Sequence, residues 1–110
     1  MIVDRDGNTA IIAQEKASVK TLVTTIEQDY DTYKNYHLVL RLSSLDKITI
    51  EDVVEFLRLS NNHRSAKKSF VVVSDKADLD EMPDEILVVP TLQEAFDIIE
   101  MEDIERDLGF

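Results

Sequence analysis

The stretch that most constrains the fold is residues 37–59, HLVLRLSSLDKITIEDVVEFLRL. It predicts a buried strand, a polar turn and an amphipathic helix in direct succession. Residues 38–42 form a short apolar run that only Arg41 interrupts, which is typical of a central strand covered on both faces. We therefore expect the rest of the chain to pack around this strand and its helix.

The expected helix has a clear start. Thr49 offers an N-cap oxygen, and Glu51 and Asp52 place negative charge where the first backbone N–H groups lack partners. Apolar residues then recur at helical spacing and should form the face that lies on the sheet: Ile50, Val53, Val54 and Leu57.

The other segments complete an α/β pattern. The Asp-Gly-Asn sequence at residues 6–8 predicts a hairpin turn between two strands, and a helix is expected over about 18–30, with residues 31–36 as a connection. Further buried strands are expected at 70–73 and 86–89, and Thr91 with Glu94 forms a capping box for a last helix. We predict one domain over residues 1–110. It should hold a single mixed sheet of about five strands, an N-terminal hairpin plus three parallel strands, with helices packed on it.

Composition and charge narrow the function. The chain has 110 residues and a net charge of −11, which disfavours direct binding to nucleic acid or to anionic membrane surfaces. It has no cysteine, no apolar run of membrane-spanning length and no signal-peptide region, so a cytoplasmic location is the expectation.

No constellation of catalytic or metal-binding residues is visible. His37 and His63 are far apart in sequence, and neither has the clustered partners that a metal ligand or a general base requires. The acidic run over 75–85 lacks the glycine of a calcium loop and favours a solvated loop. We therefore expect no enzyme activity, no metal and no cofactor.

The C-terminal segment carries two apolar stripes that one small core cannot bury together. Leu92, Ala95, Phe96 and Ile99 cluster on one side of a helix, whereas Met101, Ile104 and Leu108 fall nearly opposite. Either the helix bends near residue 100, or the second stripe is exposed as a partner or dimer surface, or it is a frayed tail that touches the sheet edge.

The order of elements, the strand-turn-helix at 38–59 and the ending VVPTLQEAFDII resemble the STAS domain, the small α/β module typified by anti-sigma factor antagonists. That family carries an Asp-Ser-x-Gly segment at the helix start, and a partner kinase phosphorylates its serine. Matched to this chain, the aspartate falls on Thr49, the serine on Ile50 and the glycine on Asp52, so the phosphorylated residue is missing.

Residues 44–110 also resemble short bacterial proteins that carry the label ribonuclease Z. Ribonuclease Z itself needs a HxHxDH di-zinc motif, which is absent here. An accessory role beside an RNA-processing nuclease is therefore the alternative function.

The main expectation is a non-enzymatic regulatory module that binds a protein partner, with a second copy of the chain as one candidate. The expected contact residues lie at the helix start and on the C-terminal stripe: Thr49, Glu51, Asp52, Met101, Ile104 and Leu108.

Overall fold

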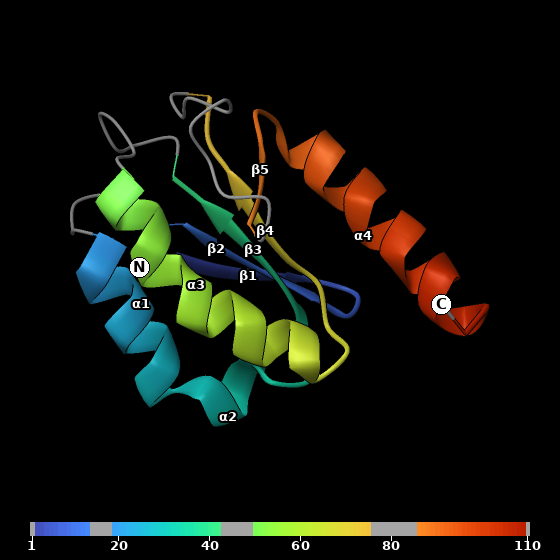
Figure 1. Ribbon diagram of the computed structural model, residues 1–110, viewed down its shortest axis with the longest axis horizontal. Helices are drawn as coiled ribbons and strands as arrows, with labels where there is room; N and C mark the ends of the chain where they lie inside the picture. The colour runs from blue at the N-terminus through green and yellow to red at the C-terminus, as the bar shows by residue number, and fades with distance from the viewer. Residues whose placement is uncertain (1, 14–18, 43–49, 76–85, 110) are drawn as a thin grey trace.

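The computed structural model describes residues 2–13, 19–42, 50–75 and 86–109 (Figure 1). The elements are, in order, β1 (Ile2–Asp6), β2 (Thr9–Ala13), α1 (Val19–Gln28), α2 (Tyr30–Tyr33), β3 (His37–Arg41), α3 (Ile50–Ser65), β4 (Phe70–Val73), β5 (Leu87–Val89) and α4 (Leu92–Asp107).

The strands form one mixed sheet in the order β1-β2-β3-β4-β5. β1 and β2 pair antiparallel, and Gly7 in their turn has a φ of 59°, a conformation that favours glycine. All later neighbours pair parallel, so that one row crosses the sheet from Ile11 through Val39 and Val71 to Leu87. The predicted α/β class, with a hairpin and three parallel strands, is confirmed.

Helices cover both faces of the sheet. α1, α2 and α3 lie on one face and α4 lies alone on the other (Figure 1). Because side chains alternate along a strand, Leu38 and Leu40 of β3 join the core under α1 and α3, while Val39 between them joins the core under α4. All four residues of β4 are buried, as expected for a central strand.

The predicted helix over 18–30 is shorter than expected. α1 ends at Gln28, and Tyr30–Tyr33 form the separate turn α2 within the stretch that we predicted to be an irregular connection. The side chain of Tyr33 is buried there, which explains why this segment is ordered as a helical turn. The predicted inner face of α1 is buried at Val19, Leu22, Val23 and Ile26.

The predicted inner face of α3 is confirmed in part, because Leu57 packs against the core but Val54 does not. Val54 is 52% exposed, whereas Phe56 and Leu59 are buried together with Ser60 and His63 one turn later. The large ring of Phe56 packs against Phe70 of β4, with ring centroids 6.2 Å apart, and this contact determines which face turns inward. The side chains of Ile50 and Val53 lie outside the described part of the structure.

The capping box of the last helix is confirmed in its first half. The Thr91 side chain accepts a hydrogen bond from the Glu94 backbone N–H at 3.2 Å, and α4 then continues unbroken to Asp107.

Candidate functional site

The inner face of α4 changes character along its length. In the first half, Ala95 and Ile99 are buried against Val39 and Val71 of the sheet. In the second half, the residues at the corresponding positions are Glu102, Asp103 and Arg106, which are charged and partly buried. This half of α4 is therefore held in place by polar contacts instead of apolar packing.

The first of these contacts joins α4 to the start of β3. The His37 side chain is 2% exposed, and its Nδ1 accepts a hydrogen bond from the Ser69 backbone N–H at 2.9 Å. Nε2 therefore carries the proton and donates to the Asp103 carboxylate at 3.1 Å. Burial lowers the pKa of His37, and Asp103 offsets only part of that effect, so the ring is neutral at pH 7.

A second group of contacts surrounds Ser69, just before β4. Its hydroxyl donates to Glu102 at 2.6 Å and accepts from Arg106 at 3.0 Å. Arg64, in the last turn of α3, donates to Glu102 at 2.9 Å and to the Phe70 carbonyl oxygen at 3.2 Å. These bonds connect α3, β4 and α4, so the rotation of α4 about its own axis is fixed.

The second histidine is buried on the opposite face of the sheet. His63 is 0% exposed; its Nε2 donates to the Tyr36 carbonyl oxygen at 2.7 Å, and its Nδ1 accepts from the Tyr30 hydroxyl at 2.6 Å. Burial lowers its pKa to about 4. Both ring nitrogens of His63, like those of His37, are therefore occupied by structural hydrogen bonds.

The described residues offer no arrangement suited to metal chemistry. No group of three histidine or acidic side chains in residues 2–13, 19–42, 50–75 and 86–109 could hold a metal ion. In the same ranges, no helix combines the length and the apolar character needed to cross a membrane.

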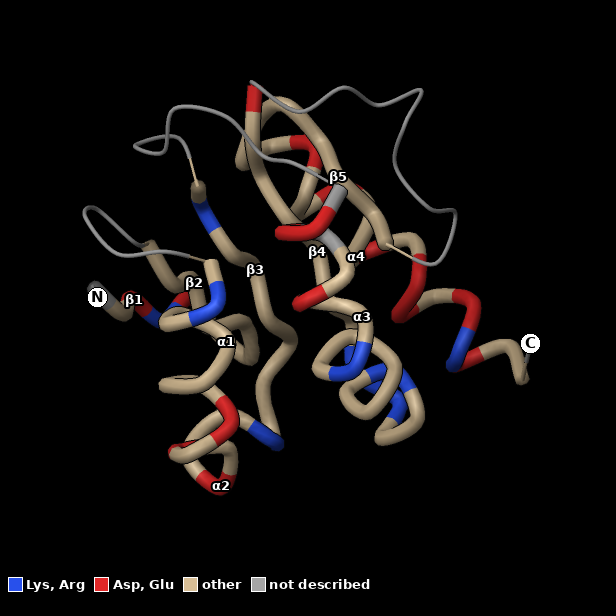
Figure 2. Tube along the Cα trace, turned by 60° about the vertical axis from the view of Figure 1, so that its left-hand side comes forward, with Lys and Arg blue, Asp and Glu red and all other residues tan. Residues whose placement is uncertain are grey.

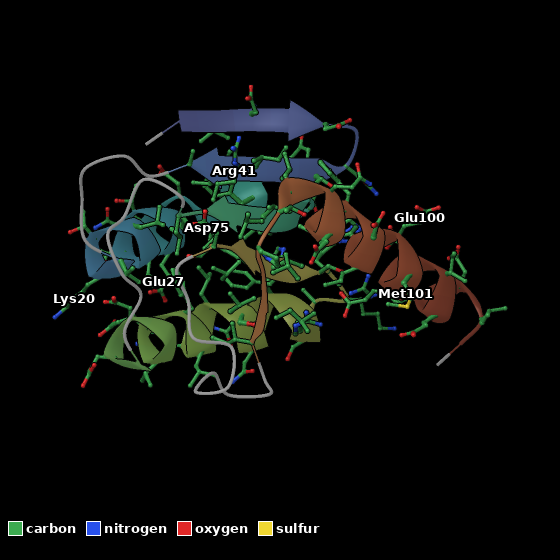
Figure 3. All side chains as sticks on the ribbon, turned by 90° about the horizontal axis from the view of Figure 1, so that it is seen from above. Lys20, Glu27, Arg41, Asp75, Glu100 and Met101 are labelled. Atoms are coloured by element: carbon green, nitrogen blue, oxygen red, sulfur yellow. The ribbon has the colours of Figure 1, made fainter. Side chains whose placement is uncertain are left out.

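The predicted stripe on the C-terminal helix lies open to solvent. Met101 is 55% exposed, Ile104 is 53% exposed and Leu108, at the helix end, is 67% exposed. α4 runs through Glu100 as one continuous helix, and the three stripe residues are too exposed to be packed on the sheet edge. Of the alternatives that the sequence left open, the structure therefore shows the continuous helix with an exposed second stripe. Figure 3 labels Met101, the first residue of this stripe, on α4.

The predicted residues at the start of α3 lie elsewhere. Glu51 is exposed and Asp52 is half-buried, and Thr49 falls outside the described residues. The start of α3 and the end of α4 are at opposite ends of the molecule (Figure 1). The structure therefore does not bring the two predicted groups into one site.

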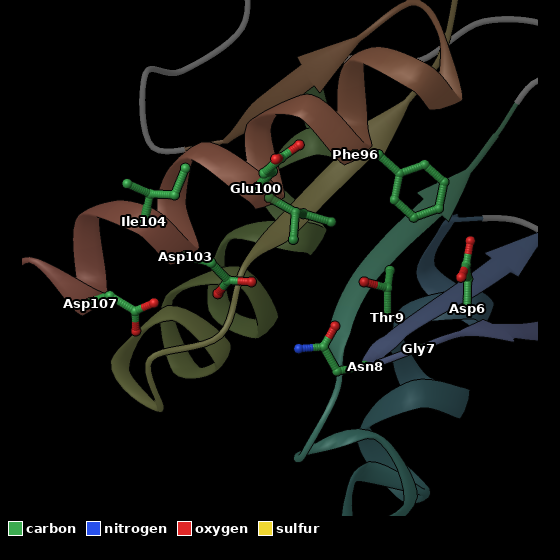
Figure 4. Close-up of a pocket in the computed structure, with 10 residues that line it drawn as sticks. Asp6, Gly7, Asn8, Thr9, Phe96, Glu100, Asp103, Ile104 and Asp107 are labelled. Carbon is green, nitrogen blue, oxygen red and sulfur yellow. The ribbon is translucent and has the colours of Figure 1, made fainter.

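Sequence reasoning missed a groove beside the stripe. It lies between the β1–β2 turn (residues 6–9) and α4, has a volume of about 440 Å³, and is lined on the helix by Phe96, Ile99, Glu100, Asp103, Ile104 and Asp107 (Figure 4). Only the folded chain brings the turn and the helix together, because about 90 residues separate them in sequence. The alternation of acidic and apolar residues in 99–107 was the one available signal.

Two solved structures share this arrangement of strands and helices. A chain from the structure "Molecular architecture of the stressosome, a signal integration and transduction hub" is 15% identical, with a TM-score of 0.58, and the match covers 90% of this chain and 96% of that one. RsbS of Moorella thermoacetica, carrying a serine-to-glutamate substitution, is 14% identical, with a TM-score of 0.64, and the match covers 96% of this chain and 97% of that one.

The chain has the STAS fold. No model of a protein family matches the sequence, and no curated protein matches it significantly. The resemblance to the STAS domain that the sequence suggested is thus confirmed at the level of the fold. Within the STAS fold of this chain, the exposed stripe and the groove both belong to the last helix, α4.

Proposed function

We propose that the protein is a non-enzymatic regulatory module, comparable in role to an anti-sigma factor antagonist, and that it binds a partner protein through the apolar stripe of α4. The stripe is formed by Met101, Ile104 and Leu108. The observation that carries this proposal is that a helix fixed in its rotation holds three large apolar side chains in solvent.

The polar contacts on the inner side explain why α4 cannot simply rotate to bury the stripe. Rotation would break the bonds of Asp103 to His37 and of Glu102 to Ser69 and Arg64. It would leave His37, which is almost fully buried, without an acceptor for its Nε2–H, and such a loss costs about 1–3 kcal/mol. The exposed stripe is therefore a stable feature of the fold, and an apolar face on a rigid helix is suited to protein recognition.

The similar structures support a role in signalling. One of them comes from the stressosome, a signal integration and transduction hub, and the other is RsbS with a substituted serine. In the STAS resemblance the phosphorylated serine falls on Ile50, which has no hydroxyl group. We therefore propose that this module binds its partner without a phosphorylation switch at that position.

The partner is best sought among other proteins. A net charge of −11 makes two copies of the chain repel each other at long range, which works against self-association. The second resemblance implied a role beside an RNA-processing nuclease, and the described contacts do not support that role. If the partner found experimentally is a nuclease, that result would favour this alternative.

The test begins with affinity purification of the tagged protein from the cells that make it. A protein that co-purifies in fixed stoichiometry is identified, produced separately and mixed again with the purified module. Sedimentation velocity of the module alone measures self-association in parallel. The proposal predicts a complex that re-forms from purified components. A module that sediments as a monomer and retains no stoichiometric partner would contradict it.

A further inference from the structure

We propose that the groove between the β1–β2 turn and α4 binds a positively charged segment of the partner, in which a lysine or arginine stands next to an apolar side chain. This inference rests on the proposed function, because the groove borders the stripe of α4. It adds the chemistry of the partner, which the stripe alone does not specify.

The shape and walls of the groove suit a side chain that is apolar along its stem. The volume of about 440 Å³ is within the range of specific ligand sites, and Phe96, Ile99 and Ile104 supply apolar walls (Figure 4). The methylene stems of lysine and arginine pack on such walls while their charged ends stay near polar groups.

The charge at the groove is negative and largely uncompensated. Asp6, Glu100 and Asp107 line it, and none of them has an ion pair with another residue in the described part of the chain. Asp103 differs, since it is bonded to His37 and Arg106. No lysine or arginine is among the described residues that line the groove, so a cation from outside is the complementary group.

The groove and the stripe form one continuous surface. Ile104 lines the groove and is also the middle residue of the stripe, between Met101 and Leu108. A single amphipathic segment can therefore place apolar side chains on the stripe and a cation in the groove. Figure 2 shows acidic residues at several positions along α4.

The probe for this proposal is a labelled synthetic helical peptide built from leucine and lysine, with a leucine–glutamate peptide of the same pattern as its counterpart. Binding is measured by fluorescence anisotropy at low and at high salt. The groove variant is Glu100→Gln/Asp107→Asn. The matched control is Glu55→Gln/Asp75→Asn, which removes the same charge at exposed positions away from the groove (Asp75 and Glu100 are labelled in Figure 3).

We expect the lysine peptide to bind the wild-type protein and the control alike. The groove variant should bind it about tenfold more weakly and with a shallower salt dependence, and the glutamate peptide should not bind. Equal weakening in the groove variant and in the control would overturn the proposal, because only the overall field of the protein would then attract the peptide. Absence of binding to the wild-type protein would overturn it as well.

A third variant separates this proposal from the proposed function. Met101→Gln/Leu108→Gln removes two of the three apolar side chains of the stripe without changing the charge or the described groove lining. If the stripe variant loses the partner while the groove variant keeps both partner and peptide, the stripe binds the partner and the groove proposal is wrong. If the groove variant loses both the peptide and the partner while the stripe variant keeps the partner, the groove proposal stands and the stripe is not the contact surface.

Discussion

His37 and Asp103 connect the start of β3 to the C-terminal half of α4, across 66 positions of the chain, with 3.1 Å between Nε2 and the carboxylate. The imidazole is almost fully buried and the carboxylate is 42% exposed on its side-chain surface. This contact fixes which side of α4 faces the sheet, and it therefore also determines that the apolar stripe faces solvent.

Removing the carboxylate should loosen α4. Asp103→Ala leaves the buried Nε2–H of His37 without its acceptor, and we expect the free energy of unfolding to fall by about 1–2 kcal/mol, with water replacing part of the lost bond. Asp107→Ala, one turn further along an exposed part of the same helix, should change it by less than about 0.5 kcal/mol. Urea unfolding measures the free energy of unfolding of each variant. Equal effects of the two variants would show that the His37 contact does not hold the helix.

The buried His63 should make the protein sensitive to mild acid. Burial lowers its pKa to about 4 in the folded state, whereas an unfolded histidine has a pKa of about 6.5. Between these values the unfolded chain binds the extra proton, so stability is greatest above about pH 6.5 and falls as the pH decreases toward 4. The loss between pH 7 and pH 5 is about 2 kcal/mol from this residue.

The measurement is urea unfolding of the wild type and of His63→Gln at pH 7 and pH 5. The variant should be less stable at pH 7, because the hydrogen bonds of His63 to Tyr30 and to the Tyr36 carbonyl are altered. Its stability should nevertheless change less between the two pH values. His37, whose pKa is also lowered by burial, keeps a part of the pH dependence. If the free energy of unfolding of His63→Gln depends on pH as strongly as that of the wild type, groups other than His63 cause the loss of stability in acid.

We predict no phosphorylation switch near the start of α3. Ile50 has no hydroxyl, and Thr49 is expected to act as the N-cap, so that Thr49→Ala should lower stability by about 1 kcal/mol. Intact-mass spectrometry of protein isolated from its native cells should show an unmodified chain. Stoichiometric phosphate on Thr49, Ser43 or Ser44 would show that a neighbouring hydroxyl has replaced the missing serine.

We also predict that the protein is not a metal-dependent nuclease. Its two histidines are on opposite faces of the sheet, and their ring nitrogens are taken by structural hydrogen bonds. Purified protein with added zinc should leave precursor RNA intact. Cleavage that depends on zinc, co-elutes with the protein and is lost in a His37→Ala variant would refute this.

Local sequence patterns predicted the fold well where one cause dominates. The run at 70–73 predicted a strand buried on both faces and the Asp-Gly-Asn sequence predicted the hairpin, and both are confirmed. The inner face of α3 was predicted correctly at Leu57 and wrongly at Val54, because the inward face of this helix also depends on the tertiary contact between Phe56 and Phe70. No local pattern reports such a contact.

The exposed stripe on α4 could be predicted only in part. The angular conflict between Ile99 and Ile104 along the helix showed that one stripe had to stay out of the core. The sequence could not show which outcome applies, because that depends on Glu102 and Asp103 meeting Ser69 and His37 in the folded chain. The predicted contact residues Glu51 and Asp52 remain a hypothesis.

The claim that the apolar stripe of α4 binds the partner is tested by isothermal titration calorimetry. The experiment compares binding of the purified partner to the wild type and to Ile104→Asp/Leu108→Asp. The control is Gln93→Glu/Asn61→Asp, which adds the same charge at exposed positions off the stripe. Urea unfolding of all three proteins accompanies it.

We predict that Ile104→Asp/Leu108→Asp unfolds at a urea concentration close to that of the wild type. It should bind the partner at least about a hundredfold more weakly, while the control binds normally. If Ile104→Asp/Leu108→Asp binds the partner as tightly as the wild type does, the stripe is not the partner-binding surface. If Ile104→Asp/Leu108→Asp unfolds cooperatively at a much lower urea concentration, the proposal is also wrong, because Ile104 and Leu108 would then belong to the core.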